Sequence, residues 1–146
     1  MIPAHLIAVG KMKSGPHKSL CEDYRKRLAA RFEMTELEAR STQDEHKKIM
    51  AALDPARPVL VLDERGEALP SKQLADKIAR LLESRGGPLQ IVIGGADGLS
   101  DDIRARADMM ISFGHMTWPH MLVRVMLMEQ IYRAQQILSG HPYHRE

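Results

Sequence analysis

Short apolar runs alternate with longer amphipathic runs along the chain. Runs typical of β-strands cover residues 5–9, 32–37, 58–63, 89–94 and 109–113. Two of them, 59–62 and 89–93, are apolar almost throughout, as in central strands of a parallel sheet that is covered on both faces. The pattern therefore predicts a sheet whose middle strands are fully buried.

Helical periodicity fills the segments between these strands, at residues 18–31, 42–53, 71–83, 100–107 and 119–138. Alternating strands and helices predict a three-layer α/β fold. The length of 146 residues fits one domain, spanning 1–146. Residues 121–128 are apolar nearly all round a helix, so we expect them to be buried on most sides, in part by a partner subunit.

The composition is that of a globular protein, with 44% hydrophobic and 27% charged residues. The single cysteine excludes an intrachain disulfide and favours a reducing compartment, which we take to be the cytoplasm. We expect no signal peptide and no membrane span, because no apolar run approaches the ~20 residues that a span needs.

Positive charge is concentrated in the first third of the chain. The formal net charge is +2 overall, but residues 1–31 carry +5 and residues 32–119 carry −4. A basic segment can face phosphates, although on charge alone a solvated helix face explains it better. So weak an overall charge predicts poor binding to free RNA and a need for a pre-assembled target.

Ligands of such folds bind beyond the carboxyl ends of the strands, which here means the loops after Asp63, Ile93 and Phe113. The loop at 94–100 reads Gly-Gly-x-x-Gly, which allows close approach of a ligand but also fits a plain tight turn. It matches neither a dinucleotide fingerprint nor a P-loop. The segment 114–120 is able to wrap an adenine or a thioether, or else to pack its tryptophan in the core.

Other chemistries are poorly represented. His141 and His144, with His115 and His120, have the residue types of a metal site, but no HExxH motif is present and we predict no metal. Cys21 lacks a convincing catalytic partner. There is no nucleophile elbow. The tail that carries His141 and His144 is either ordered by a ligand or simply disordered.

Several segments together resemble one family. They are Ile7-Ala8-Val9-Gly10-Lys11, Ile93-Gly94-Gly95-x-x-Gly98-Leu99, Thr117-x-Pro119-His120-x-x-x-Arg124, Glu129-Gln130-x-Tyr132-Arg133-Ala134 and Pro142-Tyr143-His144-Arg145-Glu146. The chain resembles the RlmH family of SPOUT-class methyltransferases, which methylate N3 of a pseudouridine in 23S ribosomal RNA. The resemblance covers essentially the whole chain, and its C-terminal part is the most specific.

The resemblance implies a SPOUT-type parallel sheet flanked by helices, with a C-terminal trefoil knot. The residues alone would not predict a knot, because knots are nearly absent from protein folds. It also implies a homodimer that binds S-adenosylmethionine in the knot and shares its active site between two subunits. The implied substrate is the helix 69 loop of 23S rRNA in the assembled 70S ribosome.

Site residues follow from the same resemblance. The cofactor pocket is expected to include Leu62, Gly94, Gly95, Gly114, His115, Met116, Thr117, Trp118 and Pro119. Trp118 departs from the family, where a smaller aliphatic residue is expected. The Gly114-His115 pair also departs, since serine-like residues are expected there.

Catalytic roles are implied for two further groups of residues. His120, Tyr143 and His144 are expected to grip the base and handle its N3 proton. Arg124 and Arg145 are expected to stabilise charge or contact phosphate, while the basic first third contacts the RNA backbone. Alternatives are that Arg124 forms an interhelix salt bridge and that His120 caps a helix.

Two other functions remain open at this point. A nucleotide-dependent oxidoreductase would use the same sheet edge, but the missing GxGxxG argues against it. A non-catalytic ribosome-binding module would have lost affinity for the cofactor. Binding of S-adenosylmethionine distinguishes both from a methyltransferase.

Overall fold

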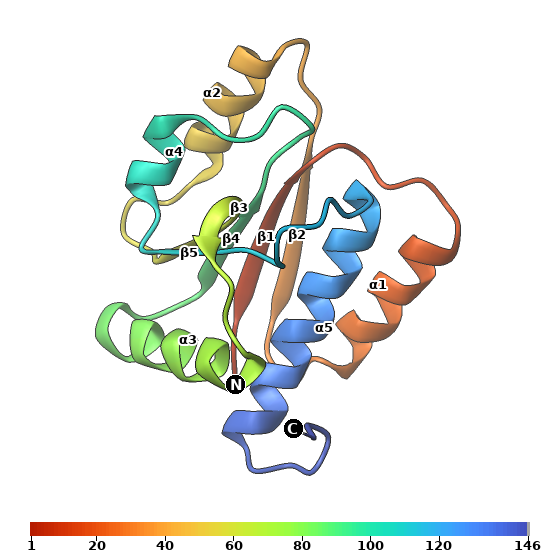
Figure 1. Ribbon diagram of the computed structural model, residues 1–146, viewed down its shortest axis with the longest axis vertical. Coiled ribbons are helices and arrows are strands. Elements are labelled where there is room, and N and C mark those ends of the chain that lie inside the picture. The colour runs from red at the N-terminus through yellow and green to blue at the C-terminus, as the bar shows by residue number, and fades with distance from the viewer. Residues whose placement is uncertain (146) are drawn as a thin grey trace.

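One parallel sheet, with strand order β2-β1-β4-β3-β5, runs through the middle of the molecule (Figure 1). The computed structural model describes residues 1–145. The strands are β1 (Ala4–Val9), β2 (Phe32–Leu37), β3 (Val59–Glu67), β4 (Leu89–Ile93) and β5 (Met109–Ile111). All four pairings are parallel, so the carboxyl ends of the five strands meet at one edge.

Helices cover both faces of the sheet. The helices are α1 (Pro16–Arg27), α2 (Thr42–Ala52), α3 (Ser71–Arg85), α4 (Asp101–Arg106) and α5 (His120–Leu138). α1, α3 and α5 share one hydrophobic core with the sheet, and α2 and α4 share another on the opposite face. The period-two alternation of a strand explains the division, because Ile91 enters the first core and Val92 the second. The predicted α/β sheet flanked by helices is therefore confirmed.

The third strand is longer than its apolar run predicts. We expected it to end at residue 63, but it continues through a polar stretch to Glu67, which pairs with Ile111 after a register shift. Gly66 permits this approach, because a Cβ there would lie 2.6 Å from the backbone nitrogen of Ile111. The extension thus ties the end of β3 to the end of β5.

Helix α5 runs from the carboxyl edge of the sheet to its opposite edge (Figure 1). Its 19 residues give it a length of about 28 Å at 1.5 Å per residue. The chain then turns back at Gly140, and the tail lies against the second half of α5, with contacts at Glu129 and Arg133. No helix within residues 1–145 is long and apolar enough to cross a membrane.

Candidate functional site

A cavity of about 460 Å³ opens at the carboxyl edge, between the loops that follow β3, β4 and β5. Its size falls in the range of small-molecule sites. Six of the nine residues expected to bind the cofactor line it: Leu62, Gly94, Gly95, Gly114, Met116 and Trp118. The other three, His115, Thr117 and Pro119, lie exposed in the same loop but outside the cavity wall.

The loop after β4 is held by the first turns of α2. The carboxylate of Glu45 accepts a hydrogen bond of 2.8 Å from the backbone N–H of Gly95. Thr42 donates to Asp97 at 2.8 Å, and His46 Nε2 donates to the carbonyl of Gly98 at 3.0 Å. The sequence does not predict a role for these three residues of α2, because each lies at least 50 positions away from its partner and no local pattern marks the contact.

Steric constraints explain both glycines at the start of this loop. A Cβ on Gly94 would lie 2.9 Å from Cγ of Leu99, and one on Gly95 would lie 2.6 Å from the carboxylate of Glu45. Any side chain at either position would therefore displace the loop or its brace. The Gly-Gly pair is needed for packing as well as for access to the cavity.

The loop after β5 is braced by its own side chains. Ser112 Oγ lies 3.1 Å from both the N–H and the carbonyl of Gly114, which adopts a φ of +100°. The indole N–H of Trp118 donates to the carbonyl of Phe113 at 3.2 Å. Trp118 is 40% exposed, so the alternative that it packs in the core is wrong.

The cavity lining carries a net charge of −1. Its charged residues are Asp63, Glu64 and Asp97 against Arg65 and Arg104. Asp63 is buried and accepts a hydrogen bond of 3.1 Å from Arg104 Nε, an ion pair that the sequence analysis did not predict. An acidic lining favours a ligand of net positive charge.

Arg124 lies in the protein interior with no exposed surface. It donates to the carboxylate of Glu36 on β2 at 2.6 Å and to the carbonyl of Gly10 at 3.0 Å. The carboxylate of Glu36 also accepts the backbone N–H of Met12 at 2.6 Å. Of the two roles considered, the structure shows the salt bridge, although its partner lies on a strand and not on another helix.

His120 begins α5 beside this buried arginine. Its Nε2 donates to the carbonyl of Val9 at 2.9 Å, and Arg124 also reaches that carbonyl at 3.3 Å. The ring therefore holds the end of β1 against the start of α5. His120 and Arg124 both lie at the end of β1. This strand is the neighbour of β4, and the loop after β4 lines the cavity.

The tail packs on the second half of α5. Tyr143 donates to the carboxylate of Glu129 at 3.2 Å, and His144 Nδ1 lies 3.2 Å from Nη1 of Arg133. Partial burial, followed by the charge of Glu129, raises the pKa of Tyr143 above its usual value. Arg145 is exposed, and the neighbouring residue 146 lies outside the described part of the chain.

The expected catalytic residues therefore lie in two groups along α5. His120 is the first residue of the helix, whereas Tyr143 contacts Glu129 at its middle and His144 contacts Arg133 in its second half. These contacts lie about 14 and 20 Å along the helix from His120, at 1.5 Å per residue. Within one chain these residues do not meet. Among residues 1–145, no three His, Cys, Asp or Glu side chains are grouped so as to hold a metal ion.

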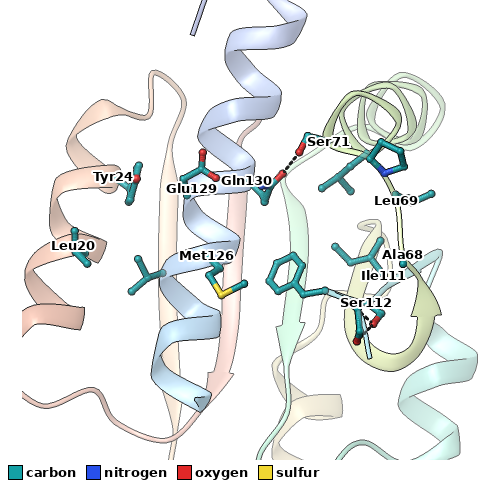
Figure 2. Close-up of a pocket in the computed structure, with 15 residues that line it drawn as sticks. Leu20, Tyr24, Ala68, Leu69, Ser71, Ile111, Ser112, Met126, Glu129 and Gln130 are labelled. Carbon is teal, nitrogen blue, oxygen red and sulfur yellow. Dashed lines mark hydrogen bonds between the residues drawn. The ribbon is translucent and has the colours of Figure 1, made fainter. Parts of the chain in front are cut away.

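A second cavity, of about 750 Å³, adjoins the first, and Figure 2 shows the residues that line it. It lies between α1 and α5 on one side and the β3–α3 connection on the other, and residues 112–114 belong to both cavities. Ser71 donates to Gln130 across it at 2.8 Å. Glu129, the partner of Tyr143, lines this second cavity, so the second cavity lies between the tail contact and the first cavity.

Comparisons with known proteins agree with this geometry. A family model described as "Predicted SPOUT methyltransferase" matches residues 2–144. A protein of Rhodospirillum centenum named "Ribosomal RNA large subunit methyltransferase H" is 48% identical over 147 residues, which cover 96% of this chain and 97% of the relative. A protein of Mesorhizobium japonicum with the same name is 43% identical, covering 94% and 96%. The chain belongs to the SPOUT methyltransferase family.

Proposed function

We propose that the protein is an S-adenosylmethionine-dependent methyltransferase that modifies N3 of a pseudouridine in the helix 69 loop of 23S rRNA. Its target is the assembled 70S ribosome, which places its action in the cytoplasm. The cavity at the carboxyl edge of the sheet is the observation that carries the proposal. The relatives named as ribosomal RNA large subunit methyltransferases support the choice of substrate.

The residues of the cavity suit the methyl donor. S-adenosylmethionine carries one net positive charge, which an acidic lining favours. Backbone groups of Leu62, Gly94, Gly95 and Gly114 would hold its adenine and ribose, and Met116 and Trp118 would enclose the sulfur. When bound, the cofactor supplies an electrophilic methyl group.

The chain's own residues then position the acceptor base. Methyl transfer is an in-line displacement, and most of its acceleration comes from holding the nucleophilic nitrogen near the methyl group. We assign the grip on the base and the acceptance of its N3 proton to His120, Tyr143 and His144, and charge stabilisation to Arg145. Arg124, which is fully buried, acts as a positioning residue through Gly10.

We propose a homodimer because these residues lie apart along α5 within one chain. In an antiparallel pair of chains, the tail of one subunit reaches the cavity of the other. A second subunit would bury apolar side chains beside the two cavities, where Leu20 is 42% and Met116 77% exposed. Half-buried Met121, Leu122 and Met126 extend the same surface along α5.

We include the C-terminal knot in the proposal. The extension of β3 and the end of β5 are tied together, because the N–H of Ser112 donates to the carbonyl of Glu67 at 2.9 Å. The chain leaves this junction, passes the loop after β4 and enters α5. In the proposed knot, the segment between β5 and α5 passes through the loop that this junction closes.

Methyl transfer from labelled S-adenosylmethionine tests the function. We expect labelling of 70S ribosomes, little labelling of free 23S rRNA, and a single modified pseudouridine on mapping. Ribosomes that stay unlabelled while calorimetry shows no cofactor binding would support the non-catalytic ribosome-binding module instead.

Deleting residues 142–146 tests the role of the tail. We expect methyl transfer to fall to background while calorimetry still finds one cofactor site per subunit, because none of residues 142–145 lines the cofactor cavity of its own chain. A tailless protein with full activity would refute the assignment.

Mixed dimers test whether the site is shared. A tailless chain is combined with a full-length Gly95→Val chain, whose loop cannot close against Glu45. A shared site predicts that the mixture recovers activity that neither parent has, because one composite site is intact. No recovery would place loop and tail in the same chain.

A further inference from the structure

A third depression, of about 800 Å³, lies at the carboxyl ends of β1 and β2. The β1–α1 loop and the residues that follow β2 form its walls. Lys11, Lys13 and Lys18 line it and are exposed. Within residues 1–145 none of these three ammonium groups has a carboxylate within 4.0 Å, and Glu38 is the one acidic residue of the lining. We call this depression the lysine pocket.

The ion pair of Arg124 and Glu36 holds the loop that carries these lysines. Arg124 and Glu36 bind the backbone at Gly10 and Met12, and the side chain of Met12 is buried below the loop. Lys11 and Lys13 therefore flank a fixed point of the backbone. A loop that is already ordered loses little conformational entropy when it binds a ligand.

The lysine pocket and the cofactor cavity share one edge of the sheet. β1 and β4 are neighbours in the strand order, so the ends of β1 and β2 lie beside the ends of β4 and β3. Adjacent strands are about 4.8 Å apart, which puts the two sites about 10 Å from each other. The two linings have opposite charge, one acidic and one basic.

On these grounds we propose that the lysine pocket binds phosphates of the ribosomal RNA next to the nucleotide that is methylated. The inference rests on the proposed function. Lysine ammonium groups are compact point charges that suit phosphate oxygens. A membrane surface fits less well, because no large exposed apolar residue of the described chain lines this pocket. Those residues are Met1, Leu20, Met50, Met116, Trp118 and Leu138.

The test compares two variants with the same change of charge. In one, Lys11, Lys13 and Lys18 are replaced by Gln. In the control, Lys72, Lys77 and Arg80, which are exposed on α3, are replaced by Gln. For each variant we measure cofactor affinity by calorimetry, the kcat and KM for 70S ribosomes, and the dependence of kcat/KM on KCl concentration.

We expect the lysine-pocket variant to raise KM at unchanged kcat and cofactor affinity. Its plot of log kcat/KM against log salt should be shallower by about 2 to 3, since each lost phosphate contact removes roughly 0.7–0.9 from the slope. The control should match the wild type. Equal KM values and equal slopes for the two variants would overturn the proposal.

Co-sedimentation with ribosomes at increasing KCl separates this proposal from the proposed function. If the wild type binds ribosomes but transfers no methyl group, the methyltransferase proposal fails. A loss of ribosome binding confined to the Lys11, Lys13 and Lys18 variant would then still support the lysine pocket. Binding that is unaffected by these substitutions would refute it.

Discussion

The ion pair between the buried Arg124 and the partly exposed Glu36 yields a quantitative prediction for Glu36→Gln. The substitution keeps an oxygen that can accept from Arg124 and Met12 but removes the negative charge, leaving the guanidinium buried without a counter-charge. Breaking one side of a buried pair costs about 3–5 kcal/mol. The side chain of Glu36 is 29% exposed, so water compensates in part and we expect a loss of about 2–3 kcal/mol.

Equilibrium unfolding in urea, followed by circular dichroism, measures this loss. With a slope of about 1–3 kcal/mol per molar urea, the midpoint should fall by about 1–2 M at an unchanged slope. The control is Glu33→Gln, at a residue on the same strand as Glu36. It breaks the exposed ion pair of Glu33 with Arg31 and should leave the urea midpoint nearly unchanged. Equal midpoints for the two variants would refute the claim that the buried pair holds the β1–α1 loop.

Two further predictions concern the core and the sheet edge. Gly66→Ala places a Cβ against the backbone of Ile111. We expect the free energy of unfolding, measured by thermal unfolding, to fall by about 3 kcal/mol, and calorimetry to show weaker cofactor binding. Wild-type values for both quantities would contradict the close approach of the two strands. Burial raises the pKa of the Cys21 thiol above its ordinary 9.0, with smaller opposing effects from Arg124. The unfolded chain therefore loses this proton first, and the free energy of unfolding should fall as pH rises through about 9. Cys21→Ala should flatten that part of the profile, and an unchanged profile would rule out the linkage.

The hydrophobic pattern predicts most of the fold, because burial on both faces of the sheet demands apolar residues wherever a central strand lies. Each of the five strands and five helices overlaps the segment that periodicity predicts, although α1 ends at Arg27 and not at Arg31. The pattern fails at the polar end of β3, where pairing with β5 and the small size of Gly66 replace hydrophobic burial as the cause of the extended structure.

The candidate site is predicted less completely. The loops that line the cavity follow from the rule that ligands bind at the carboxyl edge, but their braces do not. Glu45 reaches Gly95 from 50 positions away, and only the folded chain shows that Arg124 is buried against Glu36. The predicted helix over 119–138 already places His120 and Tyr143 apart, but no sequence signal shows that the tail folds back so that Tyr143 contacts Glu129.

The central claim is that the loops after β3, β4 and β5 hold S-adenosylmethionine at the carboxyl edge of the sheet. A crystal structure of the protein with this cofactor tests it most directly. We predict electron density for the adenosine between residues 94–95 and 114–118, with the tail of a second chain beside it. Cofactor density in the second cavity, which Leu20, Glu129 and Gln130 line, or in the lysine pocket, would contradict the account.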